Sequence, residues 1–133
     1  MNKMVVSGKR KTSIAKATIS DGSGVVLINK KPFSHFSELQ QLELREPLII
    51  AEEVLGELDF DISVNVKSGG IASRIEAARL AIARAIAKFK KSENLKGAYL
   101  AYDRNILIAD TRRKEACKPD DSKARAKRQS SKR

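Results

Sequence analysis

Two short segments hold residue types and spacings suited to binding phosphate. The first, Gly8-Lys9-Arg10-Lys11-Thr12-Ser13, places three consecutive cations beside two hydroxyl groups, between two apolar runs. Side chains and backbone amides in such a loop can both reach phosphate oxygens. The spacing differs from that of a nucleotide-binding Walker loop, in which two glycines flank four residues and Lys-Ser/Thr follows. We therefore interpret this segment as a contact for a nucleic-acid backbone, with a merely solvated hairpin loop as the alternative.

The second segment, Ser68-Gly69-Gly70, lies between a predicted strand and a predicted helix. The free amide groups in the first turn of a helix form a ready anion site, and Arg74 one turn later would reinforce it. The alternative is that the glycines only permit a tight turn and close packing of strand against helix. The two interpretations are compatible, and the sequence leaves both open.

The last eleven residues carry the densest charge of the chain. They contain no acid and no apolar residue larger than Ala, and their six cations are Lys123, Arg125, Lys127, Arg128, Lys132 and Arg133. Such a segment cannot bury enough apolar surface to offset the entropy lost on ordering. We therefore expect an extended basic tail that becomes ordered on a polyanion, and its composition favours nucleic acid as that polyanion.

The residue types needed for catalysis or metal binding form no constellation in this sequence. His35, the single histidine, lies near two phenylalanines without a nucleophile or ligand set, and Cys117 has neither a histidine partner nor a second cysteine. We expect no catalytic residue, no metal site and no cofactor. The lone cysteine excludes an internal disulfide, and the first residues lack the apolar stretch of a signal peptide. Because no apolar run approaches about 18 residues, we expect an intracellular protein without a membrane segment.

The net charge of +11 is distributed unevenly along the chain. Residues 1–16 hold five cations and no acid, and residues 112–133 hold ten cations against three acids. Residues 38–62, in contrast, hold eight acids against one arginine. Such asymmetry suits a protein that binds a nucleic acid in one orientation, with the acidic block turned away from phosphate or toward a basic neighbour.

Short apolar runs predict the strands that would position these groups. Compact β-branched runs and one period-two alternation place strands at residues 3–8, 13–20, 25–28 and 60–66. The turn signal Asp21-Gly22-Ser23-Gly24 favours a β-hairpin over 13–29.

Helical periodicity predicts the other elements. The clearest helix follows Gly70, and its apolar stripe consists of Ile71, Ile75, Ala78, Ile82, Ile86 and Phe89, with basic residues over the rest of its circumference. Shorter helices are predicted at 48–55, between Pro47 and Gly56, and at 95–102, where Tyr99 and Tyr102 would be packing residues. With a strand or loop at 106–109, this order predicts an α/β (α+β) fold, a two-layer sandwich with helices on one face of a sheet.

Four motifs follow one another over nearly the whole chain. They are Ser7 to Ala17, Gly69-Gly70 to Ala85, Asp103-Arg104 with Asp110 to Glu115, and the closing Ser131-Lys132-Arg133. Together they resemble the ninth small-subunit ribosomal protein family in its archaeal and eukaryotic form. The resemblance implies a mixed four-stranded sheet with a left-handed βαβ crossover in a globular domain of residues 1–114. It also implies an extended basic tail of residues 115–133.

The same resemblance implies a function without catalysis. A protein of this kind would be a structural constituent of the cytoplasmic ribosome, seated on small-subunit rRNA beside other head proteins, with a tail that reaches the anticodon stem-loop of P-site tRNA. Its rRNA contacts would be Lys9, Arg10, Lys11, Arg74, Arg112, Arg113, Lys114, Lys123, Arg125, Lys127 and Arg128. Lys132 and Arg133 would contact tRNA. The alternative is a free-standing basic nucleic-acid-binding factor, such as a chromosomal protein or an RNA chaperone.

Overall fold

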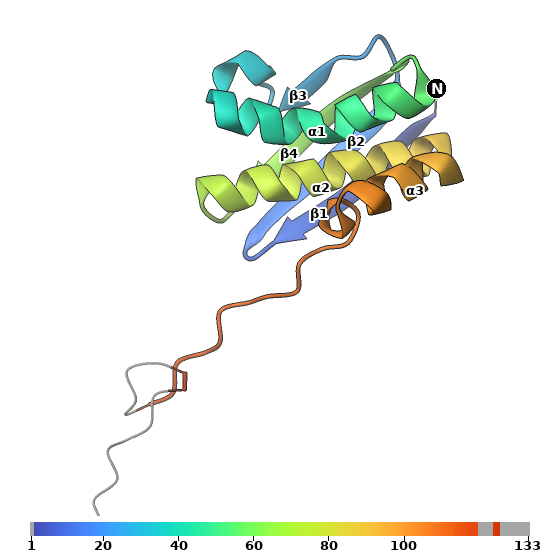
Figure 1. Ribbon diagram of the computed structural model, residues 1–133. Coiled ribbons are helices and arrows are strands. Elements are labelled where there is room, and N and C mark those ends of the chain that lie inside the picture. Colours follow the sequence, from blue (N-terminus) through green and yellow to red (C-terminus); the bar gives the residue numbers. More distant parts are fainter. Residues whose placement is uncertain (1, 120–123, 126–133) are drawn as a thin grey trace, which may run out of the picture.

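The computed structural model describes residues 2–119, 124 and 125, and it has two layers (Figure 1). One layer is a sheet of four strands: β1 (Lys3–Arg10), β2 (Ser13–Asp21), β3 (Val26–Ile28) and β4 (Phe60–Lys67). The other holds the helices α1 (Glu38–Leu55), α2 (Ile71–Lys90) and α3 (Glu93–Tyr102), all on one face of the sheet. Short 3-10 turns occur at Phe33–His35 and Arg104–Ile106. The predicted two-layer α/β fold is confirmed.

The strand order is β1-β2-β4-β3. The pairs β1/β2 and β2/β4 are antiparallel, whereas β3 and β4 are parallel, so the sheet is mixed as expected. Inward and outward side chains alternate along the strands: in β2, Ala15, Ala17 and Ile19 are buried while their neighbours are exposed or half-buried. This alternation leaves one face of the sheet against the helices, and no described residue forms a layer over the other face.

The predicted hairpin over 13–29 is wrong, because β4 lies between β2 and β3. The hairpin in the structure joins β1 to β2 through Lys11 and Thr12, with Arg10 opposite Ser13. The turn signal at 21–24 has another role, since the Asp61 carboxylate of β4 accepts bonds from the backbone amides of Ser23 and Val25, each at 2.9 Å. The turn therefore wraps around the start of β4.

Helix α1 is much longer than the predicted segment 48–55. It begins after Ser37, whose amide donates to the Gln40 side chain at 3.3 Å, and Pro47 lies inside it. Proline interrupts a helical hydrogen bond, but here its ring is buried and its carbonyl oxygen accepts the Tyr99 hydroxyl at 2.7 Å. Tertiary packing thus keeps the helix continuous, and the Ser37-x-x-Gln40 spacing is the capping signal that would have placed its start.

The connection from β3 through α1 to β4 joins two parallel neighbouring strands. Figure 1 shows that it passes in front of the sheet and is left-handed, as the family resemblance implied. Such connections are right-handed in the great majority of proteins. The unusual hand therefore distinguishes this fold from most α/β proteins.

Helix α2 forms the centre of the core. Its stripe from Ile75 to Ile86 is buried as predicted, whereas Ile71 is 71% exposed at the first turn. Alanines bury much of the remaining circumference and let β1 come close to the helix: a Cβ on Gly8 would lie 2.6 Å from the Ala77 carbonyl oxygen. Gly8 therefore serves packing between strand and helix.

Helix α3 confirms the prediction for 95–102 with two added residues at its start. Tyr99 is fully buried in the core, and burial raises its pKa. Tyr102 is 57% exposed and lies beside Glu46 of α1. Among the helices that the structure describes, none is both long and apolar enough to cross a membrane.

Candidate nucleic-acid interface

The segment Gly8–Ser13 is mostly strand, and only Lys11 and Thr12 form its turn. Because side chains alternate along a strand, Lys9 lies on the open face of the sheet while Arg10 faces α2. Lys11 projects from the turn itself, where its φ of 51° gives a left-handed backbone. The prediction that all three cations lie in one loop is therefore wrong, since Lys9 and Arg10 belong to β1 and only Lys11 lies in the turn.

Arg10 is held inside an ion-pair network. Its Nε lies 2.5 Å from Glu76 Oε2 of α2, and its Nη1 lies 3.5 Å from Asp110 Oδ2. The side chain is only 13% exposed. Arg10 thus joins β1 to α2 and to the segment that follows α3, and its contact with rRNA stays a prediction.

The turn before α2 depends on Gly69 for packing. Gly69 has φ of 76°, and a Cβ there would lie 1.9 Å from the Ser13 hydroxyl oxygen. That hydroxyl is fully buried and donates to the Ser68 carbonyl at 2.9 Å. Arg74 also reaches the Ser68 carbonyl, with Nε at 3.1 Å, and remains exposed to solvent. The structural interpretation is confirmed for Gly69, whereas a Cβ on Gly70 would meet only the Ser73 hydroxyl at 3.9 Å. The anion site stays a prediction.

Asp110 organises the start of the basic C-terminal segment. Its carboxylate accepts bonds from the backbone amide of Arg112 at 2.9 Å and from the same residue's Nη2 at 2.8 Å. These bonds to Arg112, together with the charge of Arg10, hold the pKa of Asp110 well below its usual range. Arg113 donates to the carbonyl oxygens of Asp110 and Arg112, while Lys114 is exposed. Both Arg113 and Lys114 lie on the surface.

Two arginines of the basic circumference predicted for α2 are structural. Arg79 lies 2.5 Å from Glu46 Oε2 of α1 and 3.3 Å from Asp103 Oδ2 after α3. Arg84 donates from Nε to the Leu107 carbonyl at 2.7 Å and from Nη1 to the Ser7 carbonyl at 3.2 Å. They fix the chain between α3 and the C-terminal segment, and only their tertiary partners reveal this role.

An ionic cleft of about 380 Å³ lies between α1, α2 and the segment that follows α3. Acids and bases both line it, among them Glu46, Glu76, Arg79 and Asp110. Within residues 2–119, 124 and 125, no three His, Cys, Asp or Glu side chains group in a way that could hold a metal ion. Most charges of the cleft instead pair with one another in the bonds described above, through Arg10, Glu46, Glu76, Arg79, Asp103, Asp110 and Arg112.

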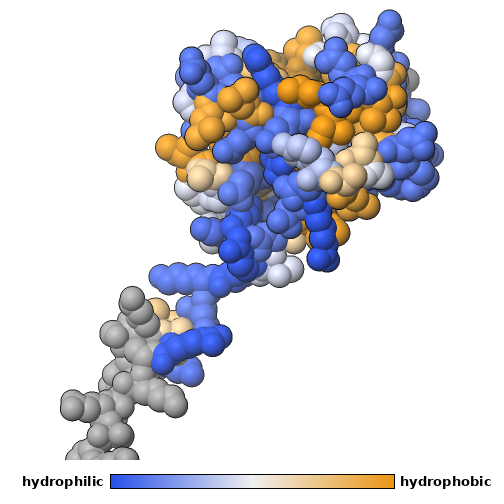
Figure 2. Space-filling model, viewed as in Figure 1, coloured by the Kyte–Doolittle hydropathy of each residue, from blue (hydrophilic) through white to orange (hydrophobic). Residues whose placement is uncertain are grey.

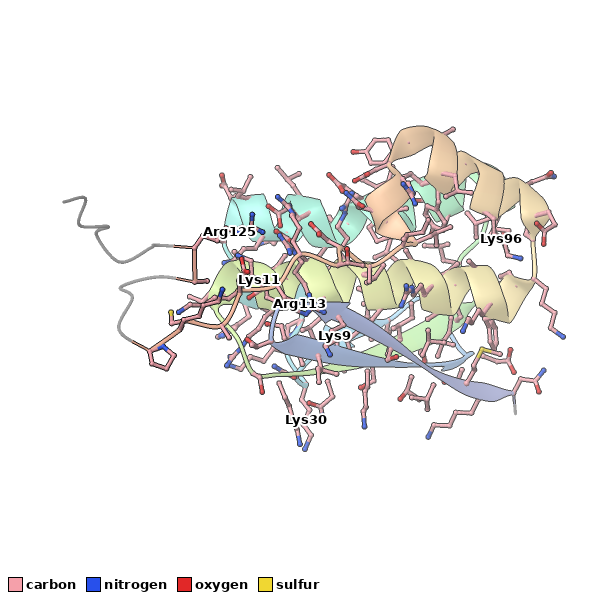
Figure 3. All side chains as sticks on the ribbon, turned by 90° about the horizontal axis from the view of Figure 1, so that it is seen from below. Lys9, Lys11, Lys30, Lys96, Arg113 and Arg125 are labelled. Atoms are coloured by element: carbon pink, nitrogen blue, oxygen red, sulfur yellow. The ribbon has the colours of Figure 1, made fainter. Side chains whose placement is uncertain are left out.

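The segment after Asp110 extends away from the body of the molecule (Figure 1), and residues 111–119 are exposed and without helix or strand. Arg125 donates from Nε to Glu115 Oε2 at 2.9 Å, with its side chain 88% exposed. Figure 3 shows Lys11, Arg113 and Arg125 toward the end of the molecule from which this segment departs. The predicted contacts Lys123, Lys127, Arg128, Lys132 and Arg133 lie outside the described residues.

Comparisons with known proteins agree with the motifs. The profile of the family described as ribosomal protein S9/S16 matches residues 8–133. The small ribosomal subunit protein uS9 of Methanococcus vannielii is 46% identical over 127 residues, and the alignment covers 93% of each chain. The protein of the same name from Methanococcus maripaludis strain C5 gives the same identity and coverage. The chain therefore belongs to the ribosomal protein S9/S16 family.

Proposed function

We propose that this protein is a structural constituent of the small subunit of the cytoplasmic ribosome and binds rRNA in the head. Its family and the names of its relatives support the ribosomal role. The observation that carries rRNA binding is the gathering of exposed cations around the end of the domain where the C-terminal segment departs. Figure 3 shows Lys11 and Arg113 there, and Lys114 follows Arg113 in the chain. Arg74 bonds to the Ser68 carbonyl, which Ser13 beside the Lys11 turn also contacts. These groups come from β1–β2, from α2 and from the end of the chain, and only the fold brings them together.

The protein would bind rRNA by neutralising phosphates and releasing counterions, and it would catalyse no reaction. The logarithm of the binding constant should then fall with the logarithm of salt concentration, with a slope of about 0.7 to 0.9 for each phosphate contacted. Lys9, Lys11, Arg74, Arg113 and Lys114 are exposed and available for such contacts. Arg10 and Arg112 would contribute beside their acidic partners.

The C-terminal tail would extend this contact away from the domain. We assign Lys123, Arg125, Lys127 and Arg128 to a path along rRNA, and Lys132 and Arg133 to the anticodon stem-loop of P-site tRNA. The absence of acids from residues 123–133 of the sequence supports both assignments. Arg125 pairs with Glu115 from outside this segment, and its 88% exposed side chain can exchange that partner for phosphate.

The acidic block would face neighbouring head proteins. Helix α1 exposes Leu39, Leu42 and Ile49 among its glutamates, and Figure 2 shows apolar surface among hydrophilic side chains on the helix side of the molecule. Carboxylates repel phosphate, so a basic protein segment with apolar residues suits this surface better than RNA. A photo-reactive residue in place of Leu42 should cross-link to a protein in assembled subunits, and a cross-link to rRNA would refute the assignment.

Sedimentation separates this function from that of a free-standing basic nucleic-acid-binding factor. A stoichiometric constituent should remain with the small subunit through a sucrose gradient at high salt, in a ratio near one per particle. A factor held by general electrostatic attraction should be released, because such binding weakens steeply with salt. Recovery of the protein at the top of the gradient would overturn the ribosomal assignment.

A further inference from the structure

The face of the sheet opposite the helices has no covering layer among the described residues. The register aligns its outward side chains in rows across β1, β2 and β4. One row holds Lys9, Ile14 and Lys67, and the next holds Ser7, Lys16 and Asn65. All six residues are exposed. The fold therefore presents a flat surface whose composition is set by alternate residues of three strands.

Three lysines form a triangle at one end of this open face. Lys9 and Lys67 share a row two strands apart, which places their backbones about 10 Å from each other, and Lys16 lies one row farther, about 7 Å along the strands. Lys30, after β3, extends from the same side of the molecule, as Figure 3 shows together with Lys9. Among the described residues, no carboxylate forms an ion pair with any of these lysines.

The remaining side chains of the face are mostly small and polar. Ser63, Thr18 and Asn65 lie between and beside the lysines. Asp61 is the one acid that the alternation of β1, β2 and β4 places here, and it lies at the opposite end. Its carboxylate is occupied by the backbone amides of Ser23 and Val25, and these bonds lower its pKa. Within the described part of the chain, no carboxylate pairs with the three lysines at the other end of the face, although Lys9 also borders the ionic cleft.

We propose that this open face binds the backbone of rRNA, with Lys9, Lys16 and Lys67 on phosphates and the hydroxyl and amide groups on phosphates or riboses. The inference rests on the proposed function and adds Lys16 and Lys67 to its contacts. Lysine, serine, threonine and asparagine are typical donors to phosphate and sugar. The face carries no aromatic side chain on which a base could stack, so it reads the backbone and not the base sequence.

A protein partner fits this surface less well. Lysine is depleted at the cores of protein interfaces, where aromatic residues, methionine and arginine are enriched. Val5 and Ile14, the apolar residues that the alternation of β1, β2 and β4 places on the face, are separated from each other by polar side chains. The charge and the spacing of the lysines therefore favour a polyanion that lies flat across the strands.

The test compares two double variants of the full chain with equal net charge. Lys16→Gln with Lys67→Gln removes two cations of the open face, and Lys88→Gln with Lys91→Gln removes two exposed cations near the end of α2. Binding to small-subunit rRNA is measured over a series of salt concentrations. The open-face variant should lower the slope of log binding constant against log salt by about 1.4 to 1.8 relative to wild type, while the α2 variant keeps the wild-type slope.

Equal slopes for wild type and the open-face variant would overturn the inference, and so would an equal loss in the α2 variant. Salt-dependent binding by the wild type in that experiment would leave the proposed function standing. If the wild type itself failed to bind small-subunit rRNA, the proposed function would fail first. As a second measurement, a photo-reactive residue in place of Asn65 should cross-link to rRNA in reconstituted subunits, and a cross-link to protein would overturn the inference.

Discussion

Replacing Gly69 by alanine tests how the turn before α2 is held. The backbone there is left-handed, with φ of 76°, which costs a residue with a Cβ about 1 to 2 kcal/mol. The new Cβ would also lie 1.9 Å from the Ser13 hydroxyl oxygen and displace it from the Ser68 carbonyl. Because that hydroxyl is fully buried, its loss of a partner costs about 1 to 3 kcal/mol more. We expect Gly69→Ala to lower the free energy of unfolding by about 2 to 5 kcal/mol.

A double-mutant cycle separates the two contributions. Ser13→Ala removes the oxygen that the new Cβ would strike, so the combination of Ser13→Ala with Gly69→Ala should be destabilised by less than the sum of the single variants. Gly97→Ala is the matched control, because a Cβ at this position of α3 meets no atom within 4 Å. It should raise stability by about 0.5 to 1 kcal/mol through helix propensity.

Urea unfolding followed by far-ultraviolet circular dichroism measures all four variants. Wild-type stability for Gly69→Ala would show that the turn tolerates a side chain and would refute the reasoning. Strict additivity in the cycle would show that the Ser13 hydroxyl is not the obstacle. A loss in Gly97→Ala as large as that in Gly69→Ala would assign the effect to glycine replacement in general.

Three further predictions follow from the ion pairs and the tail. Arg79→Ala should lower the free energy of unfolding by about 1 to 3 kcal/mol, since its two carboxylate partners lose a charged donor; a urea midpoint equal to that of wild type would contradict this. Asp110→Asn should destabilise the protein at neutral pH. Because the pKa of Asp110 is lowered in the folded state, the contribution of its carboxylate to stability is complete above pH of about 4 and is lost as pH falls through the folded pKa. A difference in unfolding free energy between variant and wild type that stayed constant down to strongly acidic pH would argue against the ion pair. Deleting residues 123–133 should leave the melting temperature unchanged, because they hold no apolar residue larger than Ala, and should weaken tRNA retention on purified subunits in filter binding; a lowered melting temperature or unchanged retention would refute it.

Local sequence signals predicted the strands well because strand periodicity depends on which side chains are buried. The runs at 3–8, 13–20 and 60–66 correspond to β1, β2 and β4 within a few residues. Their pairing was harder to predict, since the turn at 21–24 resembles that of a hairpin. The conformation of this turn is stabilised by the Asp61 carboxylate, which belongs to a strand distant in the sequence.

The start of α1 shows how a strong local rule can mislead. Proline is over-represented in the first turn of helices. Pro47 therefore indicated the start of the helix, which placed the predicted start nine or ten residues late. In the structure Pro47 is buried in the middle of the helix and accepts a bond from Tyr99. The residue that stabilises this arrangement lies in α3, outside residues 37–56, so a prediction from those residues alone could not include it.

The candidate site was predicted in its residue types but not in their roles. Three adjacent cations at 9–11 were assigned alike, although strand alternation sends Arg10 inward to Glu76 and Lys9 outward. Lys16 and Lys67 were not singled out, because each is an ordinary lysine of a strand until the sheet register places it beside Lys9. The period-two pattern was the signal that could have identified them.

The sequence by itself determined the family, the α/β class, the uneven charge and the composition of the tail, because motifs, periodicity and charge are properties of neighbouring residues. Only the tertiary structure decided which cations serve the fold and which remain on the surface. Arg10 and Glu76 are 66 residues apart, and Arg84 and Ser7 are 77 apart. An arginine beside a carboxylate or a carbonyl forms a structural bond, whereas the same residue type facing solvent stays available for phosphate. Chain folding brings those partners together, and for this reason it settles the role of each charge.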